Sequence, residues 1–412
     1  NQAIGGNFGG TVSEDLVFPQ SLKVDYVRVY QGPDTAERFE SSFVDDFLGW
    51  QEVVVPFDSL TRSAEQPAGA PDDGLSLNEV WGYGFKLPAG GSTSGTLLLD
   101  QVRVTQPPPP LAVTVTNLNN DGDGSLRAAL DIIAVGGVVS FDPSLVGGTI
   151  ALTGGPLVVD KEVTIDGADA PGISLNGGGV DRILITNAGA DVTVRNLVFT
   201  NGYGFQLAGA VLNNGDLTLD HVSVTGNTMT TNAGEFWQGG GGIYNGDGAS
   251  LVLIDSTVAN NSSGWAGGGV YSFFNASTTV VRSTISGNVA ADVGGGMRLL
   301  SNAEITNSTI SGNQSTGWYG GAFFLTDGIV DMVNSTVADN VSPAGGPAAV
   351  FVGTFSDASA TLNLVNSVVA NNVNEGCFLA PFGAGPVAIN SLGNNVFSDG
   401  TCFPVASDQV VG

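Results

Sequence analysis

Aromatic residues recur at fixed places in the second half of this 412-residue chain. A glycine-rich phrase is repeated there as GGGIY, GGGVY, GGGMR and GGAFF, beginning at residues 240, 267, 294 and 320. Each phrase fits a short β-strand, along which successive side chains point to opposite faces. If the fourth residue of each phrase points inward, the fifth residues form one outward column: Tyr244, Tyr271, Arg298 and Phe324. Arg298 would then lie between aromatic rings in a cation–π arrangement.

Further aromatic residues stand just before the glycines, at nearly equivalent turn positions: Phe205, Trp237, Trp265 and Trp318, with Tyr319 next to the last of them. Pyranose rings stack their C–H faces on exposed aromatic rings, and an exposed apolar strip usually marks an interaction site. We therefore predict that the column and the turn residues bind a glycan. The alternative is that these rings pack beneath neighbouring loops, since large aromatic side chains are commonly half-buried.

Catalysis and metal binding find less support in the sequence. A β-helix lyase of the pectate-lyase kind needs calcium-binding carboxylates and a basic residue on one outer face. Asp255 and Arg282 share a column, but no tight acidic cluster surrounds them. Asp121 and Asp123 mimic half of a calcium loop without its later glutamate, which favours a polar turn. With His221 as the single histidine, no multi-histidine metal site is predicted, and we expect no cofactor, with calcium left as an alternative.

A second repeated phrase predicts the fold. It occurs seven times between residues 192 and 372, and the last six copies close on an asparagine at intervals of 25 to 34 residues. The strands in each copy are too short to be helices, and one unit cannot bury its own apolar face. Stacked units can do so, which predicts an all-β parallel β-helix over residues 111–412, with equivalent residues in columns about 4.8 Å apart.

Two of these columns are rich in asparagine. Their members include Asn288, Asn313 and Asn340 in one column and Asn307, Asn334 and Asn366 in the other. Asparagine tolerates left-handed backbone geometry, and stacked asparagine side chains hydrogen-bond to one another. We predict that both columns are structural ladders at turns, and that His221, which belongs to the second column, is structural too.

The remaining segments set the domain boundaries. Residues 125–134 have helical apolar spacing with Ser125 as a candidate N-cap, which predicts a short helix that seals the first coil. The proline run within residues 106–110 predicts a stiff linker. Residues 21–30 are expected to form one strand, with a slip in its alternation at Tyr26–Val27.

The composition limits the partners and the compartment. The 12 Lys and Arg residues oppose 39 Asp and Glu residues, and this net charge of −27 argues against nucleic acid, which is bound by basic patches. No apolar run reaches the roughly 18 residues of a membrane helix, so no membrane insertion is expected. Cys377 and Cys402 are interpreted as a disulfide, which indicates an extracellular or cell-surface protein; two buried free thiols are the alternative.

Three segments also resemble known families. VTNLNNDGDGSLRAAL, with the GGGIY and STISGN phrases, resembles secreted or surface right-handed β-helix proteins with polymorphic outer-membrane-protein repeats, which implies that fold for residues 111–412. FPQSLKVDYVRVYQ, within residues 1–31, resembles the last strands of laminarinase-type family-16 glycoside hydrolases, whose catalytic E-x-D-x-x-E strand is absent here. FVDDFLGWQEVVVPF, within residues 38–105, resembles the second half of a family-11 jelly-roll carbohydrate-binding module.

These resemblances imply two incomplete β-sandwich segments ahead of the β-helix. The strand at residues 21–30 would have lost its own sheet, and it could then pair with another chain and promote self-association. The favoured function is non-catalytic attachment to polysaccharide within a glucanase-like multidomain protein. The alternatives are a surface adhesin or filament-forming structural protein, and a β-helix polysaccharide lyase or hydrolase.

Overall fold

The computed structural model describes residues 22–31, 38–45, 80–86 and 109–411 except 233–234, 344–348 and 356, together with a few residues between 55 and 68. The chain divides into two compact units, Asn1–Thr105 and Gln106–Gly412. The boundary falls at the start of the predicted proline linker.

The first unit contains an antiparallel sheet in the order β3-β2-β1-β4. Its strands are β1 (Leu22–Gln31), β2 (Arg38–Asp45), β3 (Thr61–Arg62) and β4 (Val80–Lys86). The predicted strand and its slip are confirmed, because the register of β1 against β2 shifts between Val24 and Val27. The prediction that this strand had lost its sheet is wrong, since β1 pairs with β2 on one side and β4 on the other. Alternation reveals a strand but not its partners, and the expected self-association through an unpaired strand therefore loses its basis.

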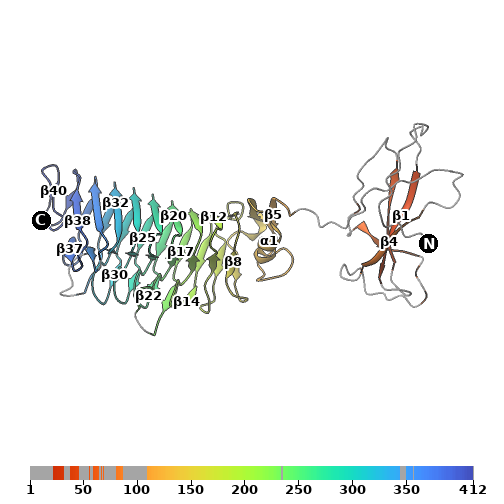
Figure 1. Ribbon diagram of the computed structural model, residues 1–412, viewed down its shortest axis with the longest axis horizontal. Helices are drawn as coiled ribbons and strands as arrows, with labels where there is room; N and C mark the ends of the chain where they lie inside the picture. The colour runs from red at the N-terminus through yellow and green to blue at the C-terminus, as the bar shows by residue number, and fades with distance from the viewer. Residues whose placement is uncertain are drawn as a thin grey trace. The chain divides into compact units, whose positions relative to one another are not determined.

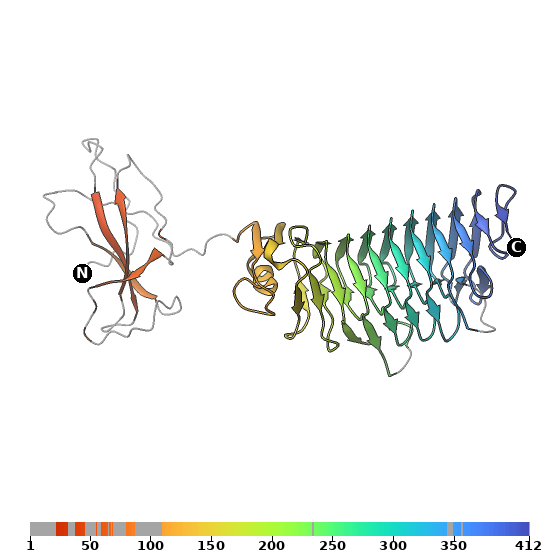
Figure 2. The same ribbon diagram turned by 180° about the vertical axis from the view of Figure 1, so that it is seen from behind.

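The second unit is a parallel β-solenoid, as predicted, in which each strand pairs with its equivalent in the next coil (Figures 1 and 2). Sheet I has eleven strands: β5 (Ala112–Val115), β6 (Gly137–Phe141), β9 (Val163–Asp166), β12 (Asp191–Arg195), β16 (Asp216–Asp220), β20 (Ser250–Ile254), β24 (Ser277–Val281), β28 (Asn302–Thr306), β32 (Gly328–Val333), β35 (Ala360–Val365) and β38 (Val387–Ser391). Sheet II has eleven strands: β7 (Thr149–Ala151), β10 (Ser174–Asn176), β13 (Val198–Thr200), β17 (Ser223–Thr225), β21 (Thr257–Ala259), β25 (Thr284–Ser286), β29 (Thr309–Ser311), β33 (Thr336–Ala338), β36 (Val368–Ala370), β39 (Val396–Phe397) and β40 (Gln409–Val410).

Two further sheets complete the coils. Sheet III has nine strands: β8 (Leu157–Val159), β11 (Leu184–Thr186), β15 (Val211–Asn213), β19 (Ile243–Asn245), β23 (Val270–Ser272), β27 (Met297–Leu299), β31 (Phe323–Leu325), β34 (Val350–Thr354) and β37 (Cys377–Pro381). Sheet IV has five strands: β14 (Tyr203–Phe205), β18 (Thr228–Thr230), β22 (Ser262–Ser263), β26 (Val289–Ala290) and β30 (Gln314–Ser315). Sheet IV lies between sheets II and III along the chain, and it was not predicted.

The inward residues of sheets I, II and III form one continuous apolar core. Val258, Ile285 and Ile310 illustrate its register, because they pair directly across β21, β25 and β29 and are 1% exposed or less. The first coil is covered by α1 (Leu126–Ile132), which confirms the predicted cap helix, and a 3₁₀ turn, η3 (Pro143–Leu145), follows it. Ser125 accepts a hydrogen bond from the N–H of Ala128, as expected of an N-cap.

One asparagine column forms the predicted ladder. Its members are Asn227, Asn261, Asn288, Asn313, Asn340 and Asn372. Each Nδ2 donates to the Oδ1 of the next asparagine at 2.9–3.0 Å, and each backbone N–H donates to the same oxygen. The first five of these side chains are at most 1% exposed, so the ladder satisfies polar groups that water does not reach.

The other column is a row of left-handed turns rather than a hydrogen-bonded ladder. Asn307, Asn334 and Asn366 have φ angles of 53°, 52° and 50° and exposed side chains. Within the described residues no hydrogen bond joins these three side chains to one another. The ladder at this corner is made instead by the neighbouring serines, which the sequence reasoning missed: Ser256, Ser283, Ser308, Ser335 and Ser367. Each Oγ accepts the backbone N–H of the equivalent residue one coil earlier.

The predicted disulfide is present at the C-terminal end of the solenoid. Cys377 and Cys402 are bonded, with their Cα atoms 5.0 Å apart and both residues buried. The bridge links sheet III to the segment after β39.

Candidate functional site

The four outward residues of sheet III stack in one column. Tyr244 pairs with Tyr271, Tyr271 with Arg298, and Arg298 with Phe324 across β19, β23, β27 and β31. The rings of Tyr244 and Tyr271 are 5.1 Å apart and nearly parallel. The guanidinium carbon of Arg298 lies 4.5 Å from the ring centroid of Phe324, which confirms the cation–π contact.

The prediction that this column is exposed is wrong. None of its four side chains is more than 7% exposed, because half-buried turn residues such as Trp265, Phe273 and Tyr319 pack over it. Together they form a second apolar cluster outside the main core. The side chains of the column also stack on one another, and this occupies the ring faces on which a pyranose would have to stack. The column therefore belongs to the packing of the solenoid, which was the alternative interpretation.

Burial controls the titration of the polar groups in this cluster. Burial raises the pKa of Tyr271 to about 12 and also raises the pKa of Tyr244. It lowers the pKa of Arg298, whose Nη1 donates to the Phe324 carbonyl oxygen at 3.4 Å. The pKa of the half-buried Asp292 carboxyl is raised by burial, and the positive charge of Arg298 opposes that shift.

The turn residues that precede sheet III remain accessible. Trp318 is 60% exposed, and Trp237 and Trp265 are half-buried. The backbone N–H of Asp292 donates to the Trp265 carbonyl oxygen at 2.9 Å, and that of Trp318 donates to the Asp292 carbonyl oxygen at 2.8 Å. Gly239 bridges to Ala266, so Trp237 lies one coil before Trp265 and one residue out of register with it. We call Trp237, Trp265, Asp292 and Trp318, one residue from each of four successive coils, the aromatic edge.

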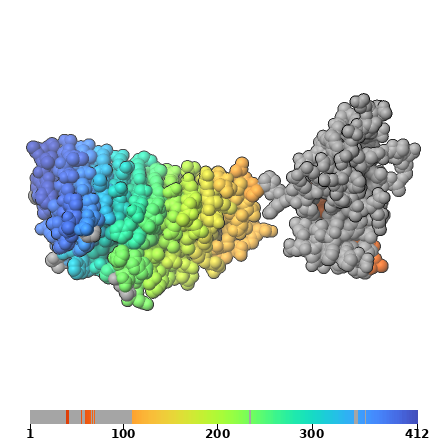
Figure 3. Space-filling view, in the orientation of Figure 1, coloured from red at the N-terminus to blue at the C-terminus, as the bar shows by residue number. Residues whose placement is uncertain are grey.

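Tyr319 lies next to the aromatic edge. Phe236, near the edge, and Asp292, within it, are not predicted from the sequence. Tyr319 is half-buried and stacks on Phe351 at 5.0 Å, so it belongs to the covered cluster. Phe236 is 61% exposed in the loop between β18 and β19, which projects from the side of the solenoid (Figures 1, 2 and 3). Asp292 stands two residues before its glycine run, as Trp265 and Trp318 do, so the same spacing could have identified it.

A charged cluster occupies the turn between sheets I and II. One ligand atom each from Asp220, His221 and Asp255 lies within 4.8 Å of the others, a spacing that could hold a cation. However, Arg282 donates to both oxygens of Asp255 at 2.8 and 2.6 Å and lowers the pKa of that carboxyl. Arg195 lies 3.4 Å from Asp220, whose other oxygen is 2.6 Å from His221 Nδ1. Both carboxylates already have cationic partners, so the cluster is an ion-pair network of the turns.

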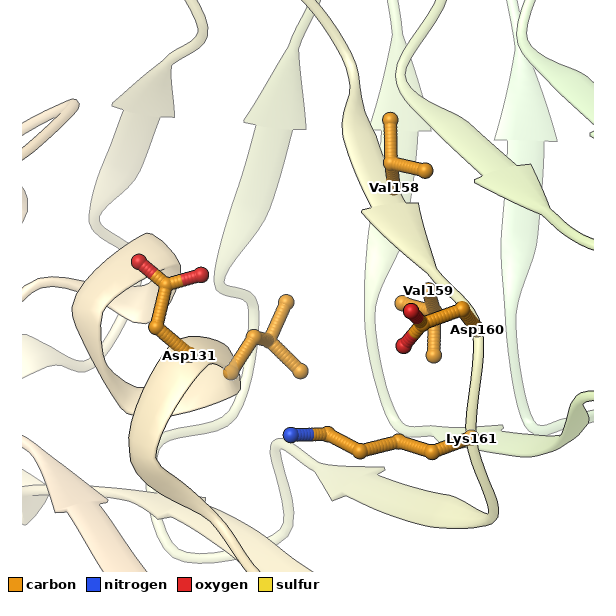
Figure 4. A pocket seen from close by; sticks show the side chains of 6 residues that line it. Asp131, Val158, Val159, Asp160 and Lys161 are labelled. Carbon is orange, nitrogen blue, oxygen red and sulfur yellow. The ribbon is translucent and has the colours of Figure 1, made fainter.

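The polar groups at the N-terminal end tie the cap helix to the solenoid. A pocket between α1 and β8 is lined by Leu130, Asp131, Val158, Val159, Asp160 and Lys161 (Figure 4). Lys161 extends toward the helix and donates to the Ile133 carbonyl oxygen at 2.9 Å. The stretch with Asp121 and Asp123 forms a turn, in which Asn117 Nδ2 donates to the Asp123 carbonyl oxygen at 2.8 Å.

A family model for a right-handed beta helix region matches residues 150–403. The chain belongs to this right-handed β-helix family. A model for a family 11 carbohydrate binding domain matches residues 27–106, which include part of β1 and all of β2, β3 and β4. Neither matched model is a glycoside hydrolase. No curated protein and no solved structure is significantly similar to the chain. Within the described part of the β-helix protein, no helix is long and apolar enough to span a bilayer.

Proposed function

We propose that this β-helix protein is a non-catalytic polysaccharide-attachment protein that acts outside the cell or at its surface. The observation that carries the proposal is the carbohydrate-binding-domain match over residues 27–106 in the same chain as the β-helix. β1 supports it structurally, because it joins the strands of the matched segment into one sheet.

Two further features support the extracellular location and the choice of β-glucan as the polysaccharide. The Cys377–Cys402 disulfide is typical of proteins that fold in an oxidising environment. The likeness of residues 1–31 to the end of a laminarinase-type glycoside hydrolase favours β-glucan as the polysaccharide and a glucanase as the neighbouring activity. The β-helix would then hold its own chain, or a partner enzyme, against the polymer.

A pull-down on insoluble polysaccharides tests this function. We expect the full chain to be retained on insoluble β-glucan and to pass through a matched column of an unrelated polymer, since attachment requires recognition of the sugar. Reducing-end assays on the same polymers should show no new ends. Retention on no polysaccharide would overturn the proposal, and calcium-dependent release of unsaturated products would replace attachment by a lyase function.

A further inference from the structure

We propose that the aromatic edge of the β-helix is a second glycan-binding site, separate from the carbohydrate-binding-domain segment. In this site the indole rings of Trp265 and Trp318 stack on pyranose rings, and the Asp292 carboxylate between them accepts a hydroxyl hydrogen bond. The inference rests on the proposed function, because it takes the ligand to be the neutral polysaccharide that the chain attaches to.

The spacing of the edge fits an extended sugar chain. Trp265 and Trp318 lie on coils that are two apart, and coils are separated by about 4.8 Å, so their backbones are roughly 10 Å apart. That distance is about the length of a disaccharide in an extended β-linked chain. One coil before Trp265, Trp237 and the exposed Phe236 would lengthen the site by a further ring.

Asp292 provides the polar contact that such a site needs. Its side chain is half-buried, yet none of the hydrogen bonds or ion pairs found among the described residues uses its carboxylate oxygens. Its carboxylate oxygens are open to solvent, and an ionised carboxylate only accepts hydrogen bonds. A sugar hydroxyl held between the two tryptophans would take the place of water at these oxygens. The positive charge of Arg298 attracts this carboxylate electrostatically.

The backbone holds these side chains in place before any ligand binds. The two ladder hydrogen bonds at 2.9 and 2.8 Å fix Asp292 between its neighbours. A Cβ on Gly317 would lie 2.8 Å from the Asp292 Cα and 2.6 Å from the Ala291 carbonyl oxygen, so only glycine lets the Trp318 turn approach this closely. A rigid site loses little conformational entropy on binding, which favours affinity.

Charge selects the class of sugar. The protein carries a net charge of −27, and the edge itself contains a carboxylate. A polyuronate such as pectate would be repelled, whereas a neutral glucan is not. The site is therefore assigned to neutral β-linked polysaccharide.

Binding of full-length variants to soluble β-glucan oligosaccharides tests the site, with calorimetry as the readout. Trp318→Ala removes an exposed ring, and we expect about tenfold weaker binding to the edge. Asp292→Ala should weaken binding, while Asp292→Asn, which keeps an acceptor, should restore most of it. Phe355→Ala is the matched control, because Phe355 is 58% exposed on the turn that follows sheet III, and the edge precedes that sheet.

The outcomes separate the two proposals. If the wild-type chain binds β-glucan and both Trp318→Ala and Asp292→Ala bind equally well, the edge is not a site and the attachment function stands. If the wild-type chain binds an acidic polysaccharide but no neutral glycan, the edge proposal fails and the attachment function stands; if it binds no polysaccharide, both proposals fail. Trp265 is half-buried. The thermal unfolding midpoint of Trp265→Ala therefore shows whether this variant is folded well enough for its glycan binding to be compared with that of the wild-type chain.

Discussion

The two asparagine columns come from the same repeated phrase but depend on different parts of the residue. In the column of Asn288, Asn313 and Asn340 the side chains are buried and hydrogen-bonded from coil to coil. In the column of Asn307, Asn334 and Asn366 the side chains are exposed, and the common feature is a left-handed backbone. One column needs the amide group, and the other needs the φ angle.

The variation between coils within this chain supports that distinction. The exposed column also contains His221, Asp255 and Arg282, which adopt φ angles of 57°, 48° and 48°. The buried column contains asparagine at all six of its positions from Asn227 to Asn372. A turn that requires only left-handed geometry accepts several side chains, whereas a ladder requires a donor and an acceptor in the same place.

The largest effect is expected when the buried ladder is broken in its middle. Asn313→Leu keeps the number of side-chain heavy atoms but removes the acceptor of two Asn288 groups, the backbone N–H and Nδ2. Buried polar groups without partners cost roughly 1–3 kcal/mol each, so we expect a loss of about 4 kcal/mol in the free energy of unfolding. Urea unfolding followed by circular dichroism measures it. A loss below about 1 kcal/mol would mean that the ladder contributes little.

A smaller loss is expected in the serine ladder beside the exposed column. Ser308 Oγ accepts the Ser283 N–H at 3.1 Å and donates to the Thr306 carbonyl oxygen at 2.8 Å. Ser308→Ala leaves one buried N–H without an acceptor, which costs about 1–2 kcal/mol. The same urea experiment on Thr309→Ala, next in the chain and half-buried on the outer face, provides the control. Equal midpoints for the two variants would contradict a role for the Ser308 hydroxyl.

The sequence was sufficient to identify the repeats and their columns. Periodic Val, Ile and Asn positions fix the register of stacked coils, and this predicted the solenoid and the buried ladder, while the helical spacing after Ser125 predicted the cap helix. It was also sufficient for β1 and its slip, because alternation along a strand is a local property. The partners of β1 are non-local, and nothing in its ten residues specifies them.

Whether the side chains of a column are exposed or covered by loops could not be predicted from the sequence, because these contacts are also non-local. Whether Tyr271 is exposed depends on where the loops around Trp265 and Phe273 fold back, and loop paths do not follow the repeat. The spacing before the glycine runs does give the position of Asp292, but Asp292 is not aromatic, so the argument from sugar stacking does not include it. Columns are thus predictable from periodicity, while exposure depends on the turns between the strands.

The smallest effect is expected when the exposed amide is removed without backbone strain, as in Asn334→Gly, and it gives the sharpest contrast with Asn313. Asn334→Leu puts a residue with no local hydrogen bond into a left-handed conformation with φ of 52°, which costs about 1–2 kcal/mol. Asn334→Gly removes the amide but adopts this geometry freely, so unfolding should change by no more than a few tenths of a kcal/mol. Asn313→Gly, in contrast, should remain strongly destabilised because its amide is missing. Similar losses for the two glycine variants would show that the exposed amide also contributes to stability, and the distinction between the columns would then fail.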